Sequence, residues 1–284
     1  MQRSAEAPST MSGISRRRFL TVAAAVPACI SFPLPAASGT SETRPTGFQS
    51  RADFYSAHKD RFLDEFVETN EGARNYLASK YGRKMADAVA DESLARFRVL
   101  LPDIPYIGGF GNPNTTYLLI AAWCEAWHGP MSRWGKSAEN TMRILYDFDK
   151  TELAEILRKK ALAEGAKKFS KQSLEKTRAW AEWTQRRSFE GDWVAYFVAG
   201  DGHEFDFGYD YTECGVVKYF RKHNSMAPAP YFCLNDFIRS QTLGTGLRRS
   251  KTLAQGDDVC NFRYKKGRPV LQNWESEVPK FHRA

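Results

Sequence analysis

The residues best suited to chemistry lie close together near the end of the chain, within residues 205–264. Thiols, carboxylates, guanidinium groups and an imidazole all occur in this stretch. A packed core alone does not require that mixture, because a buried polar group is costly unless it finds a partner. We therefore expect the functional site here, among Cys214, Cys233, Cys260, Glu213, Asp236, Asp257, Asp258, His223, Arg248, Arg249 and Arg263.

Cys214 lies where a strand pattern gives way to a helix pattern. Thr212 is a residue type that caps helices, which would place Cys214 in the first helical turn. Unpaired N–H groups there favour a thiolate and lower the pKa of a thiol from its usual value of about 8.5. This position predicts a nucleophile, although the neighbouring Glu213 opposes a second negative charge unless it binds a cation. A disulfide and a buried core thiol remain alternatives.

Asp236 interrupts an apolar helix pattern, with Phe232, Cys233 and Ser240 on the same face. A carboxylate on such a face needs a cation or hydrogen-bond donors. Arg249 or Arg263 would satisfy it structurally, and a cationic ligand would satisfy it functionally.

In the last strand pattern, residues alternate between two faces. Cys260 shares one face with Phe262 and Tyr264, and Asn261 shares the other with Arg263. Cys260 is therefore expected beside the core, near Cys214. The spacing matches neither Cys-x-x-Cys nor His-Glu-x-x-His, so no cofactor is predicted. A metal ion stays an alternative that the spacing does not support, since Cys, His and Asp side chains could still meet in space.

The elements that must position these residues change character near Asp192. Before it, apolar residues recur at helical spacing, interrupted by a Pro- and Gly-rich loop over 102–114. His128 is interpreted as the C-terminal cap of a buried helix, and Trp180 as a core residue. The predicted helices span 52–79, 84–100, 116–127, 138–146, 152–164 and 173–187.

After Asp192, β-branched and aromatic residues predict strands. The expected fold is α+β: a helical N-terminal half packed on a small C-terminal antiparallel sheet with inserted helices, forming one domain over 51–284. The predicted strands span 193–198, 205–211, 247–253 and 259–265, and the inserted helices 216–222 and 231–243.

The N-terminus has the pattern of an export signal. Ser-Arg-Arg-Arg-Phe-Leu at 15–20, followed by a short apolar run, is typical of the twin-arginine route. We expect residues 1–38 to be this signal and 39–50 a linker, with the twin-arginine machinery as a partner, only transient membrane contact and a periplasmic location. Four cysteines would remain after cleavage, enough for two disulfides in an oxidising compartment.

The chain has 284 residues and a formal net charge of +8. Its basic residues are scattered among acidic ones, as on a solvated surface. This pattern predicts no nucleic-acid partner.

Four segments together resemble the L-2-amino-thiazoline-4-carboxylic acid hydrolase family. They are Tyr211-Thr-Glu-Cys214, Cys233-Leu-Asn-Asp236, Arg249-Ser-Lys-Thr252-Leu and Gly256-Asp-Asp-Val-Cys260-Asn-Phe-Arg263-Tyr. The resemblance covers roughly 192–265 and, more loosely, the helices before it. It implies hydrolytic opening of a cyclic isothiourea, a reaction that would give an N-carbamoyl cysteine.

The residue types suit a substrate with an amidine-like carbon and a carboxylate. Glu213 and Asp236 would hold the amidine, and Arg249 or Arg263 the carboxylate in a two-pronged contact. Cys214 would attack the carbon while His223 or a carboxylate moves protons; alternatively, a carboxylate activates water directly. Two further residues from the fourth segment are expected to complete the substrate site: Asp258 and Cys260.

Two other readings stay open. One is a non-enzymatic periplasmic protein that binds a small molecule, with aromatic residues lining a pocket and structural cysteines. The other is an interaction protein held by disulfides.

Overall fold

The computed structural model describes residues 51–156 and 161–282. The predicted export signal and linker lie outside these residues. No helix in these two ranges combines the length and the apolar character needed to cross a bilayer.

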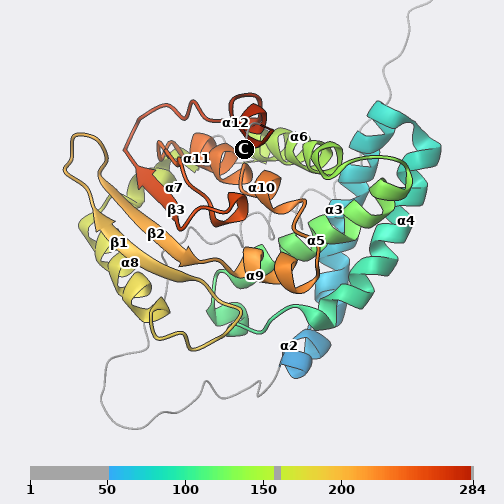
Figure 1. Ribbon diagram of the computed structural model, residues 1–284, viewed down its shortest axis with the longest axis horizontal. Helices are drawn as coiled ribbons and strands as arrows, with labels where there is room; N and C mark the ends of the chain where they lie inside the picture. The colour runs from blue at the N-terminus through green and yellow to red at the C-terminus, as the bar shows by residue number, and fades with distance from the viewer. Residues whose placement is uncertain (1–50, 157–160, 283–284) are drawn as a thin grey trace, which may run out of the picture.

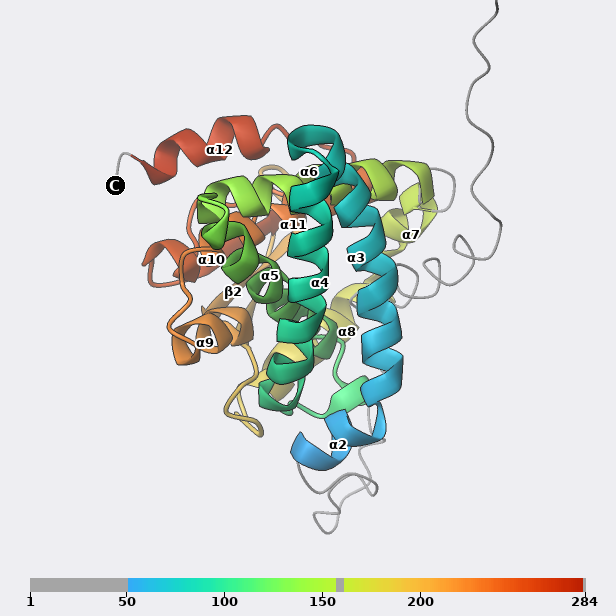
Figure 2. The ribbon, with the colours of Figure 1, turned by 90° about the vertical axis from the view of Figure 1, so that its right-hand side faces the viewer.

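The first half of the chain is helical, as the sequence predicts (Figure 1). Figure 2 shows α3 and α4 side by side, with α5 behind them. Along the chain, α3 packs against α4, and α4 packs against α5. The helices of this half are α2 (Arg51–Ala57), α3 (Lys59–Tyr81), α4 (Arg83–Leu100), α5 (Thr115–Arg133), α6 (Ala138–Ile156), α7 (Ala161–Lys167) and α8 (Lys171–Thr184), with the short 3-10 turns η1 (Leu101–Asp103) and η2 (Gly109–Gly111).

The second half contains a three-stranded antiparallel sheet in the order β1-β2-β3. This arrangement confirms the predicted α+β class. Its strands are β1 (Val194–Ala199), β2 (Phe207–Glu213) and β3 (Cys260–Tyr264). Between β2 and β3 the chain forms α9 (Gly215–Lys222), α10 (Ala229–Phe232), α11 (Asn235–Leu243) and η3 (Leu253–Gln255), and it ends with α12 (Trp274–Phe281).

The predicted strand over 247–253 is wrong. Arg248 forms a single bridge with Arg263, and the chain then leaves the sheet. The Oδ1 atom of Asn261 accepts the N–H groups of Ser250 and Lys251, and the side chain of Asp257 accepts the next one. These side chains take the donors that a strand ladder would use.

Several predicted helix boundaries also differ. The helix expected over 52–79 is divided into α2 and α3, and α6 continues through the gap expected at 147–151. The helix expected over 231–243 is divided into α10 and α11 at Cys233 and Leu234. The helix expected to end at Trp127 continues through Pro130 to Arg133. His128 is therefore inside α5 and is not its C-terminal cap.

Both halves contribute to one hydrophobic core. Phe66, Phe97 and Trp127 come from the helical half, and Phe237 and Phe262 from the C-terminal half; all are buried. The sheet and its inserted helices are therefore held against the helical half by this shared core.

Gly215 begins α9 at a point of close backbone approach. A Cβ atom there would lie 2.6 Å from the carbonyl oxygen of Gly191 and 2.5 Å from the ring of Trp193. We expect Gly215→Ala to lower the free energy of unfolding by about 1–3 kcal/mol, because a core that is already filled must shift. Urea unfolding measures this.

Gly111→Ala is the matched control, since nothing lies within 4 Å of the added Cβ atom. Its stability should stay within about 0.5 kcal/mol of the parent protein. Equal stabilities of the two variants would contradict the close packing at Gly215.

Candidate active site

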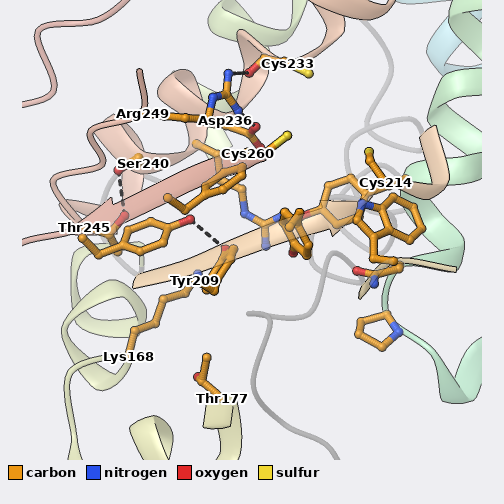
Figure 3. A pocket seen from close by; sticks show the side chains of 18 of the residues that line it. Lys168, Thr177, Tyr209, Cys214, Cys233, Asp236, Ser240, Thr245, Arg249 and Cys260 are labelled. Atoms are coloured by element: carbon orange, nitrogen blue, oxygen red, sulfur yellow. Dashed lines mark hydrogen bonds and ion pairs between the residues drawn. The ribbon is translucent and has the colours of Figure 1, made fainter. Parts of the chain in front are cut away.

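A cavity of about 120 Å³ lies between the sheet and the helices around it (Figure 3). One wall is the face formed by β2 and β3. The other walls come from α8, from α10 and α11, and from the start of α5. Segments far apart in the sequence thus meet at one site.

The sheet wall follows directly from strand register. Phe207 pairs with Tyr264, Tyr209 with Phe262, and Tyr211 with Cys260. Because paired residues point to the same side of a sheet, all six side chains face the cavity, and all six line it. The predicted alternation in the last strand is confirmed.

Three of the four described cysteines line this cavity: Cys214, Cys233 and Cys260. Figure 3 shows Cys233 and Cys260 near each other and Cys214 on the same side of the cavity. All four described cysteines are free thiols, and the fourth, Cys124, is buried in the core. The expected meeting of Cys214 and Cys260 at one site therefore occurs, and no disulfide joins any pair of these four.

Cys214 precedes α9 as its N-cap residue and is not in the first helical turn. The prediction of Thr212 as the cap is wrong, because β2 continues through that residue to Glu213. Burial raises the pKa of Cys214 to about 12, and the thiol of Cys233 adds to the rise; the N–H groups of Val217 and Val216 lower it by less. The resting thiol is thus protonated at neutral pH.

Asp236 forms a buried ion pair with Arg249. Arg249 Nη1 lies 2.5 Å from Asp236 Oδ2, and Arg249 Nη2 donates to the carbonyl oxygen of Cys233 at 2.8 Å. Burial raises the pKa of Asp236, while Arg249 and then Arg239 oppose the rise. The Arg249 side chain is only 3% exposed, whereas that of Asp236 is 32% exposed, toward the cavity.

The sequence left open whether an arginine or a cationic ligand is the partner of Asp236. In the structure, Arg249 is its partner. It also argues against Arg249 as the residue that holds a substrate carboxylate, because its guanidinium is already occupied.

Four other predicted site residues lie outside the cavity lining. Glu213 bonds Lys218 at 2.6 Å and Arg187 at 2.9 Å. The hydrogen bond from Lys218 is the main cause of its lowered pKa. Glu213 is therefore a paired carboxylate beside the strand end and is not placed to hold an amidine.

His223 is also misplaced for its predicted role. It ends α9, and its Nδ1 atom lies 3.4 Å from Oε1 of the buried Glu125 on α5. Cys214 and His223 flank opposite ends of α9. The eight helical residues between them keep His223 away from the thiol. It cannot serve Cys214 as a base.

Arg263 and Asp258 also lie away from the cavity. Arg263 points to the opposite face of β3, where it forms two hydrogen bonds with Asp210 at 2.6 and 3.2 Å. Asp258 is exposed and bonds Lys251 at 3.0 Å. The strand alternation already placed Arg263 away from Cys260, so the sequence contained the signal against this assignment.

Some cavity residues were missed. Arg239 and Tyr117 meet through a hydrogen bond from the guanidinium to the phenol oxygen, and Trp180, interpreted from sequence as a core residue, lines the cavity. Lys168 and Lys176 line it as well. No local motif marks these residues, because they come from α5, the turn before α8, α8 itself and α11, and converge only on folding.

The charges around the cavity are unequal. Lys168, Lys176, Arg239 and Arg249 line it, against the single carboxylate of Asp236. The cavity therefore favours an anionic ligand. Within the described residues, no three His, Cys, Asp or Glu side chains gather as a metal site would require.

Asp192 supports the wall of the cavity but does not line the cavity itself. Asn112 Nδ2 donates to its Oδ2 at 2.6 Å, and the N–H of Trp193 donates to its Oδ1 at 2.8 Å. It thus ties the loop before α5 to a residue of the cavity wall. Burial raises the pKa of Asp192 to about 6, against the lowering effect of these hydrogen bonds.

The fold and site define an α+β protein with a thiol- and aromatic-lined cavity. Residues 131–264 match the family model described as L-2-amino-thiazoline-4-carboxylic acid hydrolase, so the family resemblance is confirmed over this region. The match contains every cavity-lining residue except Pro113, Asn114 and Tyr117. No curated protein and no solved structure matches the chain.

The cavity thiols should react slowly in the native protein. A thiol with a pKa of about 12 has far less thiolate at pH 8 than a free cysteine, so alkylation by iodoacetamide should be at least about a hundredfold slower. Mass spectrometry of Cys214, Cys233 and Cys260 at pH 8 measures it, with urea-unfolded protein as the control. Alkylation of Cys214 at the unfolded rate would contradict its burial.

Asp192 should make stability depend on pH. Its pKa is raised in the folded state, so folding favours its protonated form. The stabilisation is complete below about pH 4 and is lost as pH rises through about 6. We therefore compare the free energies of unfolding of the parent protein and Asp192→Asn. Relative to the variant, the free energy of unfolding of the parent protein should fall by up to about 3 kcal/mol between pH 4 and 7.

Urea unfolding of both proteins across this pH range is the measurement. A constant difference in their free energies of unfolding would show that Asp192 titrates normally.

Proposed function

We propose that this cavity hydrolyses an amidine-type carbon in a ring, of the kind found in 2-amino-thiazoline-4-carboxylate. The family match supports hydrolase chemistry in general. The observation that carries the specific proposal is Asp236, the single carboxylate among the lining residues, held by Arg249 yet facing the cavity.

Asp236 is suited to act as a general base. Arg249 bonds its Oδ2 atom, while Oδ1 accepts no hydrogen bond from the described residues. Arg249 thus fixes the carboxylate and leaves one oxygen for a water molecule or an amidine N–H. Burial raises the pKa of Asp236, which makes it a stronger base than an exposed aspartate.

The reaction can be followed atom by atom. Asp236 Oδ1 takes a proton from water as the water oxygen bonds to the amidine carbon. The ring C–S bond then breaks as the C=O bond forms. The proton held by Asp236 passes to the leaving sulfur, and the remaining proton of the water passes to the ring nitrogen. The products are a ureido group and a free thiol, which accounts for every atom of the substrate and the water.

The direct-water route is favoured over covalent attack by Cys214. The Cys214 thiol would have to lose a proton from a pKa of about 12. His223, its expected base, is turned toward Glu125 instead. We assign the three cavity thiols to the wall of the site, where a small, weakly polar group packs against a ring.

Asp236→Asn should lower kcat/KM for ring opening by about a hundredfold or more, because it removes the base. Cys214→Ser should stay within about tenfold of the parent protein. The assay follows release of a free thiol from 2-amino-thiazoline-4-carboxylate. The opposite ranking would reject the direct-water route and support a covalent one.

Because Asp236→Asn leaves Arg249 buried without a counter-charge, its fold must be checked by thermal unfolding. If it is unfolded, Asp236→Asn combined with Arg249→Gln keeps a neutral hydrogen-bonded pair and should remain inactive. Ligand binding by the parent protein without any turnover would instead favour a non-enzymatic binding protein.

A further inference from the structure

One edge of the sheet is an open strand. β1 pairs with β2 on one side, and Figure 1 shows β1 and α8 together at the left of the molecule. Ala195 turns its main-chain groups away from β2, since its N–H donates to the Thr184 hydroxyl and its carbonyl oxygen accepts from Gln185. In an antiparallel strand, alternate residues direct these groups to the same side. Phe197 and Ala199 therefore present their N–H and C=O groups to the same edge.

The pairing of the other strands gives the same result. Arg263 exchanges both main-chain hydrogen bonds with Arg248, on the far side of β3. Its neighbour Phe262 therefore bonds β2, at Tyr209. By the same alternation Tyr209 turns away from β1, so its partner there, Phe197, directs its groups outward. Two independent sets of hydrogen bonds thus agree on which residues face the edge.

This edge lacks the features that usually keep strands apart. Natural edge strands are protected by lysine, proline, a bulge or a covering segment. From Tyr196 to Ala199 the sequence is Tyr-Phe-Val-Ala, without charge or proline, and the register shift lies earlier, between Val194 and Ala195. No described residue bonds the outward main-chain groups of Phe197 or Ala199. The edge is therefore suited to pair with another strand.

A groove beside this edge is shared with α8. The α8 residues that line it recur at helical spacing, so one stripe of the helix borders the groove. Glu182 continues this stripe, two turns after Glu175. Trp180 belongs to the other side of α8 and lines the cavity. The groove is lined by Phe197 and Ala199 of β1 and by Lys171, Leu174, Glu175 and Arg178 of α8, among others.

The charges of this stripe have no ionic partners among the described residues. Lys171, Glu175 and Glu182 are exposed and form no ion pair or hydrogen bond with any of them. Arg178 lies over the ring of Phe197, 4.8 Å from its centre, and also forms no ion pair within the described ranges. Spacings of three and four residues would allow pairs along α8, yet the four charges leave one another unpaired.

The order of these charges is self-complementary. Lys171 and Glu182 lie at equal distances on either side of the midpoint of Glu175 and Arg178. When two copies of α8 pack antiparallel about that midpoint, Lys171 of each copy meets Glu182 of the other, and Glu175 meets Arg178. Every facing pair is then attractive. A uniformly acidic or basic partner would instead meet like charges at half of these positions.

α8 and β1 run in opposite directions. Thr184 at the end of α8 bonds Ala195 near the start of β1. Phe169, just before α8, contacts Phe207, which pairs with Ala199 at the end of β1. A twofold axis at the edge therefore makes antiparallel neighbours of the strands and of the helices alike.

The strand and the helix also share one centre of symmetry. Pairing of Phe197 with Ala199 of the other copy uses both outward residues, and its axis passes Val198. Val198 is one residue, or about 3.3 Å, beyond Phe197, and Phe197 lies under Arg178. The same distance is about two residues of helix before Arg178. The midpoint of the four charges lies at this point of α8.

We propose that β1 and α8 form the interface of a twofold homodimer. The β1 strands of two copies join the two sheets into one, and the charged stripes of α8 pair beside them. The outward main-chain groups of Phe197 and Ala199 are then satisfied. Because the cavity lies on the other side of α8, each copy keeps its own site.

Sedimentation equilibrium of the full chain measures the dissociation constant of the dimer. The parent protein should reach twice its chain mass of 32.2 kDa. Lys171→Glu and Glu182→Lys should each weaken the dimer about tenfold, since each brings like charges together at two symmetric positions. The double variant should recover the affinity of the parent protein. The two residues lie about 16 Å apart along α8, so this rescue requires two copies.

Mixing the two single variants is the sharpest test. A copy with Lys171→Glu and a copy with Glu182→Lys carry opposite charges at both facing positions. The mixture should therefore form a heterodimer more tightly than either variant forms its own dimer. Labelling one variant with nitrogen-15 lets native mass spectrometry distinguish the heterodimer from both homodimers.

Ala199→Pro tests the strand edge. Proline removes an outward N–H that β2 does not use, and an edge strand tolerates this. The dissociation constant should rise at least about a hundredfold, because the partner's carbonyl loses its donor at two symmetric positions. Ala199→Ser keeps the N–H and should dimerise like the parent protein.

Circular dichroism checks the fold of Ala199→Pro, and the surface charge variants decide the question if it is unfolded. A monomeric parent protein overturns the inference, whether the edge is bare or covered by another segment. A dimer that folded Ala199→Pro leaves intact, or single variants that form no preferred heterodimer, overturns it as well.

Discussion

The antiparallel register of β2 and β3 is the constraint on which the site depends. A strand alternates its side chains between two faces, so a slip of one residue would exchange the two sets. In the observed register, Tyr209, Phe262 and Cys260 face the cavity together. The same register sends Arg263 to the outer face, where Asp210 neutralises it. One pairing thus builds the cavity wall and removes a predicted ligand-binding residue from it.

Charge pairing decides which polar residues remain available for chemistry. Glu213 and Asp258 are satisfied by lysine or arginine partners away from the cavity. Asp236 is also paired, but its partner Arg249 is almost fully buried and bonds only one carboxylate oxygen. This ion pair holds α11 to the segment before β3. Because Arg249 bonds only one oxygen of Asp236, the other oxygen can act on a ligand.

Much of this architecture could be predicted from residue pattern. The helical first half, the strand alternation around Tyr209 and the gathering of Cys214 with Cys260 all follow from local periodicity, because a strand or helix face is a property of its own sequence. The strand expected near Ser250 was wrong because Asn261, distant in sequence, takes its backbone donors. The pKa of Cys214 was expected to fall and instead rises, because burial outweighs the helix N–H groups.

The sequence by itself determined the fold class, the family resemblance and the stretch in which the thiols and Asp236 occur. Tertiary structure alone decided that Arg249 neutralises Asp236, that His223 turns toward Glu125, and that Lys176 and Trp180 of α8 complete the cavity. The physical reason is that periodicity reports which face a side chain occupies. Partners and burial depend on what another element places opposite that face.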